Sequence, residues 1–490
     1  MNLIGTILSE GGTPNTNEVH ILLDQKIQKY SHVITPIEEG QLILRVYDLQ
    51  ERDPYATADA LDLQRRLPRT VKALPGEEVP GRKSIAIAQP IAIVKDDGTV
   101  LEPVYVAKPE APAFLLEDTK LINLVYGLPE KSDDSFPVGT EYFSGAPVRF
   151  KVNVLPRHIL IVGTTGTGKS WLRGVILEQL HKLGVPQLIF DINREYVDAV
   201  KQLEGLILEP GRNLTISLAS ISIEIFAELV RRVLPTEWQQ AIALWAFRLY
   251  LEEARTGWER GPERLVQLIN EAGQRLSARD DSVAYTRTRV QTWLRSWRAL
   301  IGSGYDWVDA FKKQRVIAVD CSNLGEWETE LVVSSISRLL LNLRTRGLIP
   351  PFMLSLDEAH RFIPRGKTTA TATILRDLIR RGRHVGISVC IITQYPDSID
   401  TEILRIPNTK FIFAIEPGHL REMRALILDM PTELVNTLPT LPQGVCVLTG
   451  AREVIRRSLL LSVLSKRTTT HGGKTPDILS EIAEFYSEEK

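Results

Sequence analysis

The segment Gly163-Thr164-Thr165-Gly166-Thr167-Gly168-Lys169-Ser170 matches the pattern G-x-x-x-x-G-K-[ST]. An apolar run, Ile159–Val162, precedes this segment, and a helical pattern, Trp171–Leu183, follows it. Because the segment joins a strand to a helix, a phosphate-binding loop is favoured over a chance glycine-rich turn. Glycines let backbone N–H groups close around phosphates, and the N-terminus of the following helix adds partial positive charge. The sequence therefore predicts that the chain binds a nucleoside triphosphate.

Two side chains of this loop have predicted roles toward the nucleotide. Lys169 is placed to reach the β- and γ-phosphates, and the Ser170 hydroxyl is a ligand for Mg²⁺. The predicted cofactors are therefore ATP and Mg²⁺. Trp171 directly follows the loop, and we include it with the loop residues in the predicted nucleotide-binding set.

A second motif predicts what happens to the nucleotide. The apolar run Phe352–Leu356 ends in Asp357-Glu358-Ala359-His360, as a buried parallel strand does when it delivers carboxylates to the edge that carries the loop. Asp357 is then placed to hold Mg²⁺ through water, and Glu358 to orient or deprotonate the attacking water. The alternative is an acidic pair that caps a helix N-terminus. With the loop upstream, ATP hydrolysis is the better prediction.

Composition limits the classes of protein. A chain of 490 residues is too long for one hydrophobic core, and its 43% hydrophobic and 24% charged residues are ordinary for a globular protein. No apolar run reaches transmembrane length, so we predict no membrane partner. The cysteines are far apart, which predicts buried free thiols and a reducing, cytoplasmic setting. The net charge of −1 shows no global bias toward nucleic acid but leaves room for a local basic channel.

Residues 1–145 are predicted to form a small β-barrel domain. Turn residues, notably Asp97-Gly98, separate short apolar or alternating runs. We expect a helical insertion at Tyr55–Arg69 and linkers at Pro103–Pro112 and Leu128–Ala146. The runs predicted as strands are Leu3–Leu8, Glu18–Leu23, His32–Pro36, Gln41–Tyr47 and Ser84–Val94.

From residue 146 onward, strands alternate with helices, which predicts an α/β fold with a parallel sheet covered by helices. We assign residues 146–220 and 312–464 to this core, and residues 221–311 to a helical insertion whose tryptophans lie in its core. Gly444–Leu448 and Ser458–Val463 are expected to form an antiparallel edge, and residues 465–490 a tail that braces a neighbour, with a helix at Asp477–Tyr486. The predicted core strands are His158–Val162, Gln187–Asp191, Leu214–Leu218, Arg315–Asp320, Phe352–Leu356, Gly386–Ile392 and Lys410–Ile415.

Three further clusters have two interpretations each. Gln394, after a strand, either senses the γ-phosphate or is an ordinary polar strand end. Arg380, Arg381 and Arg383 either stabilise transition-state charge across a subunit boundary or form a solvated basic helix end. The carboxylates of Asp191-Ile-Asn-Arg-Glu195 either support Mg²⁺ or water, or cap the next helix.

Taken in order, these segments resemble the HerA family, which is grouped with the FtsK-like hexameric DNA-pumping ATPases. The resemblance rests on Thr-Thr-Gly-Thr-Gly-Lys-Ser, Asp-x-x-x-Glu-Tyr, Leu-Asp-Glu-Ala-His-Arg-Phe, Gly-Arg-x-x-Gly-Ile and Thr-Gln-x-Pro, and it covers most of the chain. It implies a RecA-like P-loop ATPase core behind an N-terminal β-barrel. It also implies a homohexameric ring that translocates on double-stranded DNA and works with the nuclease NurA on DNA ends.

The resemblance also assigns residues. It places the family's arginine finger on Arg383, with Arg381 in reserve, and brings Arg157 toward a neighbouring subunit's nucleotide. One departure is Tyr395, which stands where the family often has an arginine after the Thr-Gln pair. The resemblance therefore assigns no counterpart to that arginine in this chain.

The predicted DNA contacts lie in the basic stretch from Arg361 to His384, in which Asp377 is the one acidic residue. Within it, residues 366–373 read as a polar loop of small residues that faces the central channel of a ring. Arg365 and Lys367 are predicted to hold DNA phosphates without reading bases. The alternative is an ordinary surface loop. The sequence has no helix-turn-helix or zinc-finger signature, so sequence-specific recognition is not predicted.

Two other functions remain open at this point. One is a ring ATPase of the conjugation or secretion type that moves another substrate. The other is a non-catalytic, nucleotide-bound scaffold, which would not need Glu358. The intact set Lys169, Ser170, Asp357 and Glu358 favours a working ATPase over the scaffold.

Overall fold

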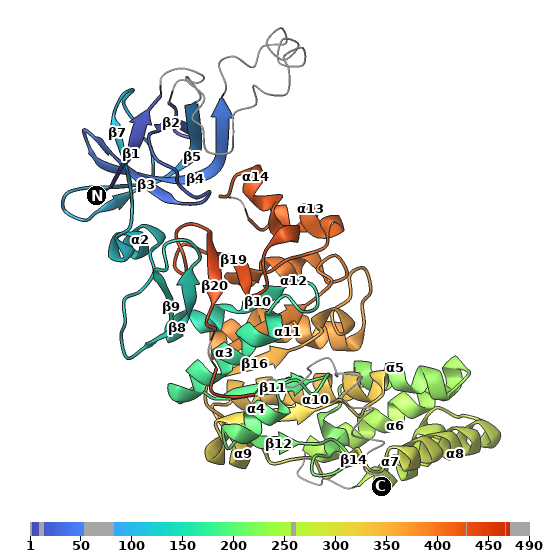
Figure 1. Ribbon diagram of the computed structural model, residues 1–490. Helices are drawn as coiled ribbons and strands as arrows, with labels where there is room; N and C mark the ends of the chain where they lie inside the picture. The colour runs from blue at the N-terminus through green and yellow to red at the C-terminus, as the bar shows by residue number, and fades with distance from the viewer. Residues whose placement is uncertain are drawn as a thin grey trace, which may run out of the picture. The chain divides into compact units, whose positions relative to one another are not determined.

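The computed structural model describes residues 2–8, 14–52, 83–255, 261–427, 429–465 and 467–470 (Figure 1). The predictions for Tyr55–Arg69, Trp258 and Asp477–Tyr486 lie outside the described residues. The chain divides into two compact units. The first is Met1–Phe150 with Glu416–Val463, and the second is Lys151–Ile415 with Leu464–Lys490.

The N-terminal part of the first unit is a closed β-barrel, as predicted. Its sheet runs in the order β2-β1-β7-β3-β4-β5-β6, and pairing of β5 with β2 closes the barrel. Alternating side chains such as Ile4, Val33 and Leu42 point inward and form its buried core. The strands are β1 (Asn2–Ile7), β2 (Val19–Leu23), β3 (His32–Ile37), β4 (Gly40–Arg52), β5 (Lys83–Val94), β6 (Val100–Leu101) and β7 (Pro112–Leu115).

The first unit also contains the antiparallel series β19-β20-β8-β9. The linker predicted at Leu128–Ala146 is therefore wrong, because β8 lies within it and pairs with β20. Turn residues around Phe136 and Val138 obscure the signal of this buried strand, and its partner is far away in sequence. The elements are α2 (Thr119–Tyr126), β8 (Ser135–Glu141), β9 (Pro147–Lys151), α13 (Leu420–Arg424), α14 (Thr432–Val435), β19 (Val445–Gly450) and β20 (Leu459–Val463).

The second unit contains a parallel sheet in the order β12-β15-β11-β16-β17-β10-β18. The predicted parallel sheet is thus confirmed, with one correction. Of the strand predicted at Leu214–Leu218, only β13 (Ile216–Ser217) is extended, and it pairs with β14 (Ile301–Gly302) outside this sheet. The sheet strands are β10 (Ile159–Val162), β11 (Gln187–Asp191), β12 (Leu206–Leu208), β15 (Val316–Asp320), β16 (Phe352–Leu356), β17 (Ile387–Thr393) and β18 (Thr409–Ile412).

Helices accompany this sheet and extend into a separate helical region (Figure 1). The core helices are α3 (Lys169–Lys182), α4 (Val197–Gln202), α10 (Glu326–Thr345), α11 (Ala370–Val385) and α12 (Thr401–Arg405). The predicted helical insertion contains α5 (Ile223–Val233), α6 (Glu237–Arg255), α7 (Pro262–Arg275) and α8 (Asp280–Ser296). Helix α9 (Trp307–Lys313), which the prediction also assigned largely to the insertion, instead packs Phe311 against Phe352 of the sheet strand β16. Among the described residues, no helix is both long and apolar enough to span a membrane.

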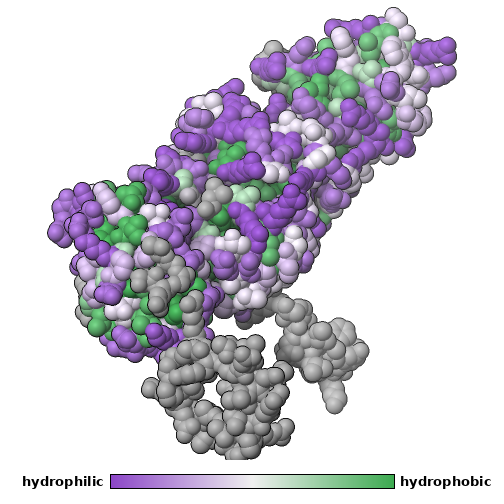
Figure 2. Space-filling view, turned by 90° about the horizontal axis from the view of Figure 1, so that it is seen from above, coloured by the Kyte–Doolittle hydropathy of each residue, from purple (hydrophilic) through white to green (hydrophobic). Residues whose placement is uncertain are grey.

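The insertion's tryptophans do not all lie in its core. Trp307 is buried, but Trp238 is 47% exposed and Trp245 is 36% exposed, so the core prediction is wrong for these two. Both stand on the outer face of α6, while Ala243, Ala246 and Phe247 face inward. Figure 2 shows hydrophilic residues over most of the visible face, with hydrophobic residues in small groups. The cysteines Cys321, Cys390 and Cys446 are buried and free, as predicted.

Candidate nucleotide-binding and catalytic site

The predicted phosphate loop lies between β10 and α3. Gly166 and Gly168 have φ angles of 78° and 117°, in the left-handed region that side chains disfavour. A Cβ atom on Gly163 would lie 2.6 Å from the Phe413 Cβ. No side chain in the described part of the chain caps α3, so its first backbone N–H groups face the loop. This arrangement suits an anion.

Lys169 is folded over the loop. Its Nζ donates a hydrogen bond to the Thr164 carbonyl oxygen at 2.7 Å, and the residue is only 7% exposed. Burial lowers the pKa of Lys169, and the carboxylates of Glu358 and Asp357 oppose this effect. The ammonium group therefore lies in the field of the acidic pair that the sequence predicts as catalytic.

The acidic pair follows β16 and is buried, with Asp357 6% and Glu358 8% exposed. Glu358 has φ 47° and ψ 44°, a left-handed conformation that is strained for a residue with a side chain. The Glu358 side chain makes no capping hydrogen bond to the short helix that follows, which argues against the helix-cap interpretation. His360 Nδ1, for which the sequence predicts no role, approaches Glu358 Oε2 to 3.3 Å.

Gln394 connects the loop to the acidic pair. The Thr165 hydroxyl donates to Gln394 Oε1 at 2.7 Å, and Gln394 Nε2 donates to Glu358 Oε1. This contact arises because β10, β17 and β16 are parallel neighbours, so their carboxyl ends lie at one edge of the sheet. The structure therefore brings Gln394 into the site, rather than leaving it as an ordinary strand end.

Asp191 and Glu195 take different positions. Asp191 accepts hydrogen bonds from the backbone N–H groups of Glu195 (2.9 Å), Tyr196 (2.8 Å) and Val197 (3.1 Å), so it caps the start of α4. Burial raises the pKa of Asp191 to about 6. Glu195 has a buried Oε2 atom that accepts no hydrogen bond from the described residues. The negative charge of Glu195 raises the pKa of Asp357.

The donors at this edge fit Mg²⁺. Burial, together with the carboxylates of Glu195 and Glu358, raises the pKa of Asp357 to about 8, which marks a cluster of anions that a cation would stabilise. Within the described residues, no group of three or more His, Cys, Asp or Glu side chains forms a metal site. Mg²⁺ commonly takes one or two protein ligands and completes its shell with water and substrate phosphates. Ser170 and Asp357 are suited to that role.

The predicted arginines differ in their surroundings. Arg383 is exposed in the last turn of α11 and forms no ion pair in the described chain. Arg381 instead pairs with Asp377 at 3.0 Å. Arg157 ends the short helix before β10, where its carbonyl oxygen accepts the Asn408 N–H. None of the described contacts joins Arg381 or Arg383 to the loop of its own chain.

The predicted DNA loop is shorter than expected. Thr369 caps α11, so Ala370 already belongs to the helix, and Thr371 is buried. The structure also pairs two arginines of the basic stretch with acidic residues that the sequence analysis did not include. Arg376 pairs with Asp400 at 2.7 Å, and Arg380 pairs with Glu402 at 2.6 Å. These acids follow β17, where sequence order alone does not show that they face α11.

Arg365 and Lys367 are exposed on the segment before α11. Arg365 Nη1 donates to the Asp397 carbonyl oxygen at 3.4 Å. The ion pairs of Arg376, Arg380 and Arg381 neutralise much of the charge on α11 itself. Part of the positive charge that the sequence assigns to the basic stretch is therefore offset along α11.

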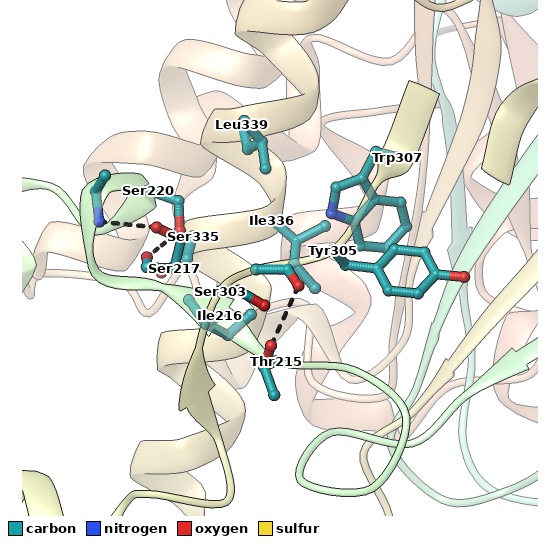
Figure 3. Close-up of a pocket in the computed structure, with 12 residues that line it drawn as sticks. Thr215, Ile216, Ser217, Ser220, Ser303, Tyr305, Trp307, Ser335, Ile336 and Leu339 are labelled. Carbon is teal, nitrogen blue, oxygen red and sulfur yellow. Dashed lines mark hydrogen bonds between the residues drawn. The ribbon is translucent and has the colours of Figure 1, made fainter. Parts of the chain in front are cut away.

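A cavity of about 270 Å³ lies elsewhere in the same unit, between β13, β14, α9 and α10 (Figure 3). Figure 3 shows Tyr305 and Trp307 on one side of it and the hydroxyls of Ser217, Ser220 and Ser335 on the other. No Lys, Arg, Asp or Glu of the described chain lines this cavity. It therefore lacks the charge that a triphosphate or its Mg²⁺ needs, and the nucleotide site remains at the loop.

Comparison with known proteins agrees with this geometry. Residues 136–340 match the family model described as the central domain of helicase HerA. The chain is 24% identical to the DNA double-strand break repair helicase HerA of Sulfurisphaera tokodaii, over 96% of this chain and 95% of the relative. It is 23% identical to the protein of that name from Sulfolobus acidocaldarius, over 98% and 97% of the two chains.

Among solved structures, VirB4 of Thermoanaerobacter pseudethanolicus superposes with a TM-score of 0.55 and 16% identity, covering 69% of this chain and 98% of that one. At this identity the likeness concerns the fold alone, a P-loop ATPase core. The matched central domain, the similarity along nearly the full length of the relatives and the assembled loop and acidic pair agree with one another. Residues 136–340 thus match the HerA central domain, and the chain is similar to HerA proteins, with a P-loop ATPase core, along nearly its full length.

Proposed function

We propose that this protein is an ATP-hydrolysing motor that translocates on double-stranded DNA as a homohexamer. We further propose that it works with a NurA-type nuclease in DNA end resection and double-strand break repair. The observation that supports a working ATPase best is the bridge from Thr165 through Gln394 to Glu358. The names of its relatives support action on DNA breaks.

Each residue of the site has a role in the proposed hydrolysis. The loop amides and Lys169 bind and orient the phosphates, while Ser170 and Asp357 would hold Mg²⁺, which supplies charge neutralisation between the β- and γ-phosphates. Glu358 orients the attacking water and accepts its proton. Gln394 is hydrogen-bonded to Glu358 and senses whether the γ-phosphate is present. Arg383 acts on the nucleotide of the neighbouring subunit.

A direct test compares ATP hydrolysis by the full chain alone, with linear duplex DNA and with single-stranded DNA. We expect duplex DNA to stimulate hydrolysis more than single-stranded DNA does. The control is the Lys169→Ala variant, which should be inactive under every condition. Hydrolysis that responds to neither form of DNA would contradict the DNA motor and favour a motor for another substrate.

We also expect the Arg365–Lys367 segment to grip DNA through phosphates. The Arg365→Ala/Lys367→Ala variant should bind duplex DNA more weakly than the parent protein does. The loss of affinity should be about the same for duplexes of unrelated sequence. The slope of log affinity against log salt concentration should become less steep by about 0.9 for each DNA phosphate that the variant no longer binds. Basal ATPase activity without DNA should survive, because neither residue belongs to the nucleotide site.

The matched control for this variant removes charges that already neutralise each other. Arg380 and Glu402 form an ion pair beside the segment, so Arg380→Ala/Glu402→Ala should leave the salt slope unchanged. An unchanged slope in the Arg365→Ala/Lys367→Ala variant would instead move the DNA contact to the helical insertion, where Arg287, Arg289 and Arg295 are next.

A further inference from the structure

The last described residues of the chain lie along α3, the helix that begins at the phosphate loop. We call the segment Leu464–Thr470 the strap; Lys466 within it is outside the described residues. Trp171 Nε1 donates to the Leu464 carbonyl oxygen at 2.8 Å. At the other end, the Thr470 N–H donates to Gln202 Oε1, the side chain of the last residue of α4, at 2.9 Å. The strap therefore connects the first turn of α3 with α4.

Glu178, in the third turn of α3, is the main anchor of the strap. Its side chain is 3% exposed. It accepts hydrogen bonds from the backbone N–H groups of Thr468 and Thr469, both at 3.0 Å, and from both threonine hydroxyls. Burial raises the pKa of Glu178, but the bonds from Thr469 and Thr468 outweigh it and bring the value to about 2. A buried carboxylate satisfied in this way is a strong, directional anchor.

A notch in α3 accommodates Arg467. The Arg467 side chain is 1% exposed; its Nε lies 3.2 Å from Glu178 Oε1, and its guanidinium group lies 5.2 Å from the centre of the Trp171 ring. A Cβ atom on Gly174 would lie 2.0 Å from Arg467 Cζ. A glycine in a helix interior is destabilising relative to an alanine. The presence of Gly174 in α3 is explained by the space that the Arg467 guanidinium group needs.

Trp171 links this docking site to the phosphate loop. It lies in the first turn of α3, where backbone N–H groups have no acceptor within the helix. Those N–H groups are the ones that a bound phosphate uses. The strap holds the Trp171 indole, while the backbone of the same turn faces the phosphates. The strap and the phosphate loop therefore both contact the first turn of α3.

We propose that the strap positions the first turn of α3 for the phosphates of ATP, with Trp171, Glu178 and Arg467 as positioning residues. Strap docking and nucleotide binding are then coupled, and each favours the other to the same extent. This inference rests on the nucleotide-binding part of the proposed function.

The experiment uses Gly174→Ala in the full chain. Alanine favours a helix more than glycine does, so any loss must come from displacement of Arg467 rather than from weakening of α3. Binding of a fluorescent, non-hydrolysable ATP analogue with Mg²⁺ is measured by anisotropy. We expect affinity to fall about 5-fold or more, within the usual range of coupling between sites. Gln179→Ala is the matched control, because Gln179 lies on the same helix and its side chain forms no hydrogen bond to the described residues of the strap.

The reciprocal measurement is hydrogen exchange of the Thr468 and Thr469 amides, which donate to Glu178. In the parent protein, the analogue should slow their exchange, and Gly174→Ala should remove this protection. Glu178→Gln serves as a second variant if Gly174→Ala does not fold. Parental affinity in both variants, with exchange insensitive to nucleotide, would overturn the strap's role. Failure of the parent protein to bind the analogue would instead overturn the nucleotide site itself.

Discussion

The Glu358→Gln variant should bind ATP and stall, with hydrolysis reduced by about 10²–10⁴-fold. Glutamine cannot accept a proton from the attacking water, so the general base is lost. The fold of the site should persist, because the amide oxygen of the introduced glutamine can still accept the hydrogen bond that Gln394 Nε2 donates to Glu358 Oε1 in the parent protein. Single-turnover phosphate release and binding of radiolabelled ATP separate these two effects.

Lys169→Ala is the companion variant and should behave differently. It removes the ammonium group that lies over the loop, so it should lose ATP affinity as well as turnover. A parental rate of phosphate release in Glu358→Gln would show that another group activates the water, and His360, 3.3 Å from Glu358, is the first residue to examine.

The second large effect concerns Arg383. If this side chain completes the site of a neighbouring subunit, Arg383→Ala should lower turnover by roughly 10³–10⁵-fold while each subunit still binds ATP. Its exposure and its lack of an ion pair in the described chain support such a role. Arg381→Ala is the matched control two residues away. Arg381 already pairs with Asp377, so its removal should have a small effect.

Mixed rings test whether Arg383 acts between subunits. Arg383→Ala and Glu358→Gln subunits are each inactive alone, but a mixed interface can contain an intact carboxylate and an intact arginine. We expect single-turnover hydrolysis to reappear at intermediate ratios, since that assay needs only one competent interface. Silence at every ratio, with mixed rings confirmed by native mass spectrometry, would rule out an Arg383 finger in trans.

Sequence patterns predict the parts of the molecule whose signals are local. The loop Gly163–Ser170 and the pair Asp357-Glu358 each follow an apolar strand, and the structure places both at the carboxyl ends of parallel strands. The same patterns miss strand β8, because its partner β20 comes much later in the chain and nothing near Ser135 indicates that pairing. They also assign Trp238 and Trp245 to the core, because helical spacing does not show which face of α6 has a partner.

A phosphate loop, an acidic pair and a parallel α/β sheet follow from the amino-acid order alone, because each depends on neighbouring residues and on backbone geometry. What those groups touch depends on the folded chain. The hydrogen bond between Thr165 and Gln394 spans 229 residues, and the one between Glu178 and Thr468 spans 290. Such contacts form because of the order of strands in the sheet and because the chain returns to α3. A local sequence pattern contains no information about either arrangement. For the same reason Asp191 is a helix cap while Glu195 adds negative charge near Asp357, although one short motif contains both.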